Sequence, residues 1–434
     1  MGFYIGTYAS AEEDGILEVK YDRETDSLQV TGRQRGVTNP SWLLLHPNGR
    51  VLYAVEERNP DGGLCAFLID EALGGKETFP VAGNDAATQE QQERQGTPFL
   101  HPCGSWPTGG ADPCHLSLDD RGEFLFVSNY TSGSLAVFRL GENGVPAERT
   151  DLVQHTGHST GPGADPVRQE GPHVHFSAFH EGELYVVDLG QDTVFRYELD
   201  RESGRLRDTG RPIVLPAGRG PRHLAFGPDN RLYVLCELSS SLFVLEKQED
   251  GAYQAVQEIS ALSQGVTDKV NTAAAIHFSE DGRMLYTSNR GEDSIAAFAL
   301  EEDGRVRRIG FAASGGRVPR DFAVCGDRLL AANQESNELT VLVNLENDIK
   351  NMNHQDPAGE KQRSTVNHEK WSGIDQEEKG EGVLFALPTQ GRPVCLTPVP
   401  EPHELPEPHP EEESNKAPEP CTGDDLRSDE LSLD

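Results

Sequence analysis

A repeating pattern of short strands constrains the fold more than any other feature of this chain. A complete copy has an apolar strand, a turn rich in Asp, Asn and Gly, a second apolar strand, another turn and a third strand. Six copies fall at residues 40–57, 113–138, 172–197, 221–245, 275–298 and 319–342. Because one such repeat cannot bury its apolar faces alone, the copies must pack against one another. The alternation of apolar residues, without a long helical period, predicts an all-β fold.

A seventh copy is divided between the two ends of the chain. Residues 3–8, 15–21 and 28–31 match the second, third and fourth strands of a repeat, and residues 393–396 match the missing first strand. Pairing these segments would close a ring of repeats. We therefore expect a seven-bladed β-propeller in which the N- and C-terminal strands share one blade.

This arrangement predicts a single propeller over residues 1–397, followed by a tail. Two stretches interrupt the repeats, at about 70–112 and 344–380, and their polar composition predicts surface loops or disordered segments. Residues 398–434 are rich in Pro and Glu, and we expect them to form a disordered acidic tail.

The charge balance limits the classes of partner. The chain has 38 basic and 72 acidic residues, a net charge of −34, which argues against nucleic acid as a ligand. No apolar run approaches the ~18 residues of a membrane span, and the first residues lack a signal-peptide pattern. The seven cysteines include no CxxC pair, so we expect a cytoplasmic protein without a metal site, and without any cofactor.

Six motifs, in order along the chain, carry a family resemblance. They are Tyr-Ile-Gly-Thr-Tyr at 4–8, Gly-Pro-His-Val-His at 171–175, Gly-Pro-Arg-His-Leu-Ala-Phe at 220–226, Cys-Glu-Leu-Ser-Ser at 236–240, Ser-Asn-Arg-Gly-Glu-Asp-Ser-Ile at 288–295 and Pro-Arg-Asp-Phe-Ala at 319–323. With these motifs the chain resembles the lactonase family of seven-bladed propellers, typified by bacterial 6-phosphogluconolactonases, over residues 3–343 and 383–397. Propellers that lactonize carboxylated muconates are related.

Alignment of the repeats predicts which side chains share one mouth of the propeller. Equivalent positions at the start of the first strands are Ser41, Cys114, His175, Arg222, Ala274 and Arg320. Equivalent positions at the end of the second strands are Tyr8, Glu57, Tyr130, Glu237, Arg290 and Gln334. Because neighbouring first and second strands are antiparallel, these two sets meet at the same end of the channel.

Four of these positions, His175, Arg222, Glu237 and Arg290, are also the ones that the family resemblance assigns to the active site. Opening a lactone needs a base for the attacking water and positive charge near the developing oxyanion. Either Glu237 or His175 could be the base, and Arg222 and Arg290 could bind a phosphate and the oxyanion.

Three further residues are candidates for substrate binding. Arg320 would extend the basic mouth, and Arg168 and Gln169 resemble a family motif before the Gly-Pro-His segment. A cationic mouth on an acidic protein indicates an anionic small-molecule ligand.

The resemblance implies hydrolysis of 6-phosphoglucono-δ-lactone to 6-phosphogluconate in the pentose phosphate pathway. A lactonizing isomerase with the same residues, and a non-catalytic scaffold, are the alternatives. In the scaffold alternative, Arg222 and Glu237 are a structural ion pair and His175 only packs a strand start.

Overall fold

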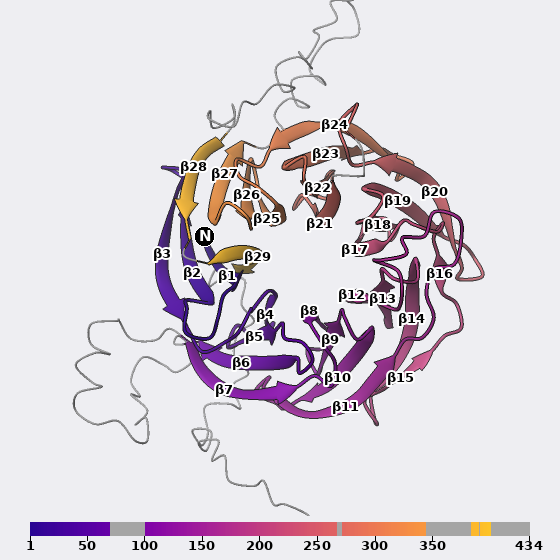
Figure 1. Cartoon of the computed structure of the whole chain (residues 1–434), viewed down its shortest axis with the longest axis horizontal. Coiled ribbons are helices and arrows are strands. Elements are labelled where there is room, and N and C mark those ends of the chain that lie inside the picture. The colour runs from indigo at the N-terminus through magenta and orange to yellow at the C-terminus, as the bar shows by residue number, and fades with distance from the viewer. Residues whose placement is uncertain (70–99, 267–270, 344–382, 390, 401–434) are drawn as a thin grey trace, which may run out of the picture.

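Seven β-sheets surround a central axis in the computed structural model (Figure 1). The structure describes residues 1–69, 100–266, 271–343, 383–389 and 391–400. The prediction of a seven-bladed propeller is confirmed. Among the described residues, no helix has the length and apolar character needed to cross a membrane.

Each blade has its first strand nearest the axis and its last strand at the rim (Figure 1). The first blade that is continuous in sequence contains β4 (Leu43–Leu45), β5 (Val51–Glu56), β6 (Gly63–Ile69) and β7 (Leu100–Pro107). The second contains β8 (Pro113–Leu118), β9 (Phe124–Asn129), β10 (Ser134–Leu140) and β11 (Pro146–Gln154). The third contains β12 (Val174–His180), β13 (Glu183–Asp188), β14 (Thr193–Asp200) and β15 (Arg205–Asp208), and β16 (Ile213–Val214) also pairs with β14.

The next three blades follow the same order. They contain β17 (Pro221–Phe226), β18 (Leu232–Cys236), β19 (Ser241–Lys247) and β20 (Tyr253–Ser260); β21 (Thr272–Phe278), β22 (Met284–Arg290), β23 (Ser294–Leu300) and β24 (Val306–Ala313); and β25 (Pro319–Cys325), β26 (Arg328–Asn333), β27 (Glu338–Val343) and β28 (Val383–Pro388).

The strand sequences reflect their depth in each blade. The second strands β5, β9 and β18 are buried along their whole length, which explains their continuous apolar runs. The outer strand β11 is mostly exposed. Neighbouring blades bury apolar side chains against each other: Val55 and Leu64 share a core cluster with Leu116 and Val127 of the next blade. The blades therefore hold the ring together through packing.

The terminal strands close the ring as predicted. The blade order is β29 (Arg392–Val399), β1 (Gly2–Tyr8), β2 (Ile16–Asp22) and β3 (Ser27–Gln34). β29 runs antiparallel to β1, with Ile5 opposite Leu396. The strand extends further than expected, because Pro398 and Val399 pair with Phe3 and Gly2 and so are not part of a tail. Residues 401–434 lie outside the described residues.

The two interruptions differ in part from the sequence interpretation. Within 70–112, residues 100–107 are not loop but the outer strand β7, which pairs with β6 from Gly63 to Ile69. Pairing to β6 satisfies the backbone of a segment whose own apolar pattern is weak. Residues 70–99, and the whole of 344–380, lie outside the described residues.

Candidate active site

A β-bulge at the mouth end of the first strands positions much of the site. The pairing register shifts by one residue in β8, β12, β17 and β25. The residues passed over are Cys114, His175, Arg222 and Arg320. A bulge leaves one residue unpaired and re-aims its side chain. In each of these four blades, the bulged residue therefore adds one side chain at the mouth to those that the alternating strand already places there.

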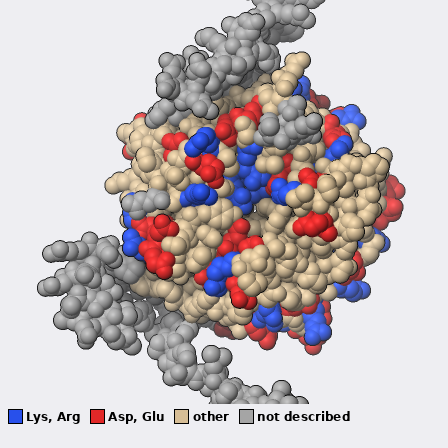
Figure 2. Space-filling view, viewed as in Figure 1, with Lys and Arg blue, Asp and Glu red and all other residues tan. Residues whose placement is uncertain are grey.

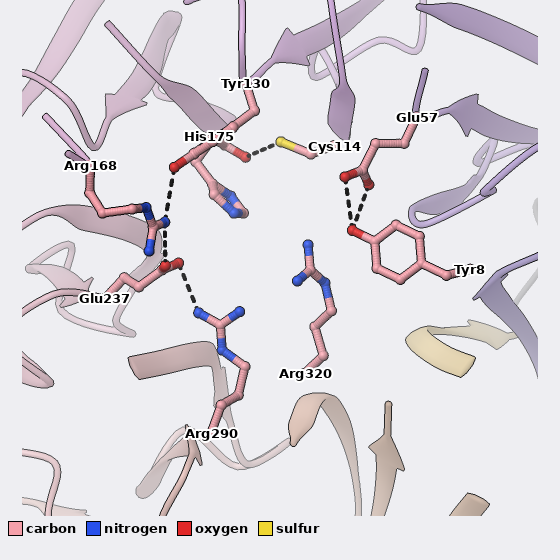
Figure 3. Close-up of a pocket in the computed structure, with 9 residues that line it drawn as sticks. All are labelled: Tyr8, Glu57, Cys114, Tyr130, Arg168, His175, Glu237, Arg290 and Arg320. Atoms are coloured by element: carbon pink, nitrogen blue, oxygen red, sulfur yellow. Dashed lines mark hydrogen bonds and ion pairs between the residues drawn. The ribbon is translucent and has the colours of Figure 1, made fainter. Parts of the chain in front are cut away.

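The second strands supply the facing residues at or just beyond their ends. Nine side chains line a cavity of about 200 Å³ at this mouth, and Figure 3 shows how they converge: Tyr8, Glu57, Cys114, Tyr130, Arg168, His175, Glu237, Arg290 and Arg320. Figure 2 shows basic side chains gathered over the centre of the ring. The structure thus brings together the predicted residues Arg168, His175, Glu237, Arg290 and Arg320.

Glu237 is surrounded by guanidinium groups. One carboxylate oxygen, Oε1, lies 2.7 Å from Nη2 of Arg168. The other, Oε2, lies 3.0 Å from Nε of Arg222 and 2.9 Å from Nη2 of Arg290. Only 4% of the Glu237 side chain is exposed, so its carboxylate is shielded from solvent. The carboxylate fixes the positions of three arginines from three segments of the chain.

These charges determine the protonation of Glu237. Burial alone would raise its pKa, but Arg290, Arg222 and Arg168 outweigh burial and hold the pKa well below its usual range. A carboxylate in this state accepts a proton poorly. Guanidinium groups also engage both oxygens of Glu237, whereas Nδ1 of His175 has no hydrogen-bond partner among the described residues, so of the two bases considered from the sequence Glu237 is the weaker candidate.

Arg222 is not among the residues that line the cavity, but it contacts the lining residue Glu237. Its side chain is buried, and Nη1 lies 3.0 Å from Nε2 of His223. Burial and the nearby charges of Arg290 and Arg320 lower the pKa of Arg222 to about 9, which leaves it charged at neutral pH. Its positive charge acts on the lining residues Glu237 and His175.

His175 presents a neutral imidazole to the cavity. Its Nδ1 atom is buried without a hydrogen-bond partner among the described residues. Burial, followed by the charge of Arg222, lowers the pKa of His175 well below its usual value. The ring packs edge-on against Tyr130 and His223, with centroids 5.6 and 5.4 Å away. A neutral imidazole at this position can accept a proton from a bound water.

Arg320 is the one cavity arginine without an ion-pair partner in the described part of the chain. Its guanidinium points to the middle of the cavity, between Glu57 on one side and Arg290 on the other (Figure 3). Its carbon Cζ lies 5.3 Å from the centre of the Tyr8 ring, a cation–π contact. The group is held in place and remains available to an anion.

Arg168 and Gln169 are adjacent in sequence but lie in different surroundings. Arg168 lines the cavity and donates from Nη2 to the Tyr130 hydroxyl at 2.9 Å. Gln169 does not line it, contrary to expectation: Nε2 donates to the Leu189 carbonyl and Oε1 accepts from the Asp165 backbone, both at 2.9 Å. Its amide holds the loop that carries Arg168.

Aromatic side chains from four blades pack against one another beside the bulged residues. His115 and His223 follow the bulged residues Cys114 and Arg222, and both contact the ring of Trp42, with centroids 4.4 and 5.6 Å away. Phe176 packs between the two histidines, 3.9 and 4.8 Å from them. These four rings come from four blades, and His223 also contacts the ring of His175, which lines the cavity.

Four lining residues were not selected as site residues from the sequence: Tyr8, Glu57, Cys114 and Tyr130. The alignment of repeats had placed all four at this mouth, so the register was the signal that identified them. Burial raises the pKa of the Cys114 thiol, so Cys114 is not a reactive thiolate at neutral pH. Within the described ranges, no group of three or more His, Cys, Asp or Glu side chains is arranged to hold a metal ion.

Comparison with known proteins identifies the family. The family model described as "Lactonase, 7-bladed beta-propeller" matches residues 2–355. The chain belongs to this lactonase family. Among its relatives, the 6-phosphogluconolactonase of Bacillus subtilis (strain 168) is 32% identical over 345 residues, which cover 78% of this chain and 89% of the relative.

The chain is also similar to a second curated protein and to a solved structure. The 6-phosphogluconolactonase of Formosa agariphila is 30% identical over 351 residues, covering 78% of this chain and 91% of that protein. The structure of the periplasmic gluconolactonase of Pseudomonas aeruginosa matches with a TM-score of 0.70 and 26% identity, over 92% of this chain and 99% of that one.

Proposed function

We propose that this protein hydrolyses 6-phosphoglucono-δ-lactone to 6-phosphogluconate. The observation that carries the proposal is the guanidinium of Arg320, which points into the cavity and has no ion-pair partner among the described residues. Arg168, Arg222, Arg290 and Arg320 carry four positive charges against the two carboxylates Glu237 and Glu57, so the mouth keeps positive charge to spare. The names of the relatives in Bacillus subtilis and Formosa agariphila support the phosphorylated sugar lactone as substrate.

The residues divide the chemistry in a way that follows from their charges. Neutral His175 takes a proton from water as the water oxygen attacks the lactone carbonyl carbon. Arg290 stabilises the oxyanion that forms, and Arg320 binds the phosphate. When the ring C–O bond breaks, the protonated His175 returns its proton to the leaving oxygen, which becomes a hydroxyl. Because its pKa is depressed, the imidazolium is a strong acid for this step.

Glu237 has a positioning role in this mechanism. Its carboxylate holds Arg168, Arg222 and Arg290 within 3.0 Å, so the guanidiniums need not reorganise as the oxyanion develops. We propose that the reaction belongs to the pentose phosphate pathway and takes place in the cytoplasm. The six described cysteines are all free, which suits a reducing compartment.

The decisive experiment generates the lactone enzymatically and measures 6-phosphogluconate with a coupled dehydrogenase, after subtraction of spontaneous opening. We expect catalysis of 6-phosphoglucono-δ-lactone, and a kcat/KM for unphosphorylated glucono-δ-lactone lower by about 100-fold or more, because it lacks the anion for Arg320. Arg320→Ala should remove most of this preference. Turnover no faster than the spontaneous rate would reject the proposal.

His175→Asn tests the assignment of the base. We expect kcat to fall by about 100-fold or more while KM changes little, because proton transfer is lost and the arginines remain. A wild-type value of kcat in His175→Asn would return the role of base to another group.

A further inference from the structure

The cavity contains a second carboxylate, Glu57, in surroundings unlike those of Glu237. Glu57 follows β5, across the cavity from Glu237 (Figure 3). The Tyr8 hydroxyl lies 2.8 Å from Oε1 and 2.9 Å from Oε2, and the Ser41 hydroxyl also donates to Oε2. Two neutral hydroxyl groups, from two blades, therefore orient this carboxylate.

No ion pair neutralises Glu57 in the part of the chain that the structure describes, whereas three arginines neutralise Glu237. Arg320 points into the space between the two carboxylates and is not within ion-pair distance of either. Burial, together with the charge of Glu57, raises the pKa of Tyr8, so its hydroxyl remains a donor at neutral pH. The negative charge of Glu57 is thus exposed to whatever occupies the cavity.

This arrangement determines which ligand groups can approach each side. An ionised carboxylate only accepts hydrogen bonds, at about four lone-pair sites. Tyr8 and Ser41 each contribute a single hydroxyl proton, so Glu57 retains capacity for further donors. Sugar hydroxyls are such donors, whereas phosphates and carboxylates are acceptors that Glu57 would repel.

We propose that Glu57, oriented by Tyr8 and Ser41, is a hydroxyl-binding subsite that selects polyhydroxylated substrates and directs their anionic group towards Arg320. The inference rests on the proposed function, because it assigns the substrate class of the same cavity. It also disfavours carboxylated muconates, which would offer anionic groups but no hydroxyls to this side. Glu57 is here a specificity residue, and His175 keeps the role of base.

Binding of two matched ligands tests this subsite without requiring turnover. The first is 6-phosphogluconate, and the second is 6-phosphohexanoate, which has the same terminal groups but no hydroxyls. By calorimetry, we expect the wild-type protein to prefer 6-phosphogluconate. Glu57→Gln should lower the affinity for 6-phosphogluconate by about 10- to 100-fold, because hydrogen bonds to a charged acceptor are lost. Affinity for 6-phosphohexanoate should be unchanged or higher, because a repulsive charge is gone.

Glu56→Gln is the matched control. Glu56 is the preceding residue, but it pairs with Arg58 at 3.2 Å and does not line the cavity. It should retain the wild-type preference, and Tyr8→Phe should lose part of it. Thermal melting of each variant identifies any that fail to fold. If Glu57→Gln does not fold, the ligand preference of Tyr8→Phe tests the subsite in its place.

The outcomes separate this inference from the proposed reaction. A Glu57-dependent preference for 6-phosphogluconate in a protein that does not open the lactone would support the subsite and reject the reaction. If the protein hydrolyses the lactone but binds both ligands equally, the subsite proposal is overturned. It is also overturned if Glu57→Gln loses affinity for both ligands to the same degree. Failure of the wild-type protein to bind either ligand would also overturn it.

Discussion

Single charged residues in this site differ mainly in how they are paired. Glu237 and Glu57 line the same cavity, yet three guanidiniums contact the first and two hydroxyls contact the second. The chain sequence shows two glutamates after two similar strands and gives no sign of this difference. It arises because Arg222 of the same blade and Arg290 of the next blade contact Glu237, while Tyr8 of β1 and Ser41 just before β4 contact Glu57.

Replacement of Glu237 should therefore affect both stability and catalysis. In Glu237→Gln the three arginines lose their shared counter-charge, and we expect unfolding to become easier by about 3 kcal/mol or more. We expect kcat/KM to fall by about 100-fold, since Arg290 is no longer held for the oxyanion. Denaturant unfolding and steady-state kinetics measure the two effects.

Glu170→Gln provides a control for this experiment. Glu170 is a largely exposed carboxylate near the mouth, 3.3 Å from His173, and its loss should change stability little. Wild-type stability and activity in Glu237→Gln would show that the arginines do not depend on it.

Three buried histidines predict the response of stability to pH. Burial lowers the pKa values of His115, His175 and His223 well below the usual value, so they stay neutral in the folded protein. The unfolded chain takes up their protons below about pH 6.5, so stability must fall as the pH drops through that value. Each histidine should contribute a slope of about 1.4 kcal/mol per pH unit.

Unfolding free energies measured between pH 5 and 7.5 test this slope. His115→Phe keeps an aromatic ring against Phe176 and Trp42. Because one protonation site is lost, it should reduce the slope by about 1.4 kcal/mol per pH unit. An unaltered slope in His115→Phe would show that this histidine is not neutral in the folded state.

Among the elements, the first strands and the terminal strands were the most predictable. Their apolar alternation repeats along the chain, so both the blade count and the pairing of β1 with β29 followed from sequence. The strand β7 was missed, because Pro102, Gly104 and Pro107 break its pattern and its pairing to β6 defines it instead. The bulges were not foreseen either, although the aligned register located their residues.

Two truncations test the element that closes the ring. Deletion of residues 392–434 removes β29, and with it the buried side chains of Val394, Cys395 and Leu396. We expect loss of cooperative thermal unfolding and of activity, because β1 would become an open edge beside an exposed core. Deletion of 401–434 should change neither property. A large loss in the shorter deletion would contradict the prediction that the tail is separate from the propeller.

For the molecule as a whole, the sign of charge at the mouth opposes the sign of the total. The chain carries a net charge of −34, whereas guanidinium groups converge on the axis (Figure 2). The distance over which these charges act depends on ionic strength, because the Debye length falls from about 30 Å at 0.01 M salt to about 8 Å at 0.15 M. Salt therefore screens repulsion by the distant acidic surface more than attraction inside the cavity.

This difference predicts an unusual salt dependence. Between 10 and 150 mM KCl (about 0.01 and 0.15 M ionic strength), we expect kcat/KM for the phosphorylated lactone to rise about two- to fivefold. The value for glucono-δ-lactone should stay constant. Deletion of 401–434 removes twelve acidic and two basic residues and should make the rise smaller. A fall in kcat/KM with salt would mean that the arginines dominate even at long range.

Arg320 lines the cavity and has no ion-pair partner among the described residues, so it can bind an anion on a product as well as on a substrate. In the proposed lactone hydrolysis, a product that stays bound there excludes the next substrate. The product keeps the phosphate that Arg320 would bind and gains a carboxylate. The product would then slow the reaction by competing with the substrate for the cavity. A cell would gain feedback on this step without a separate regulatory site.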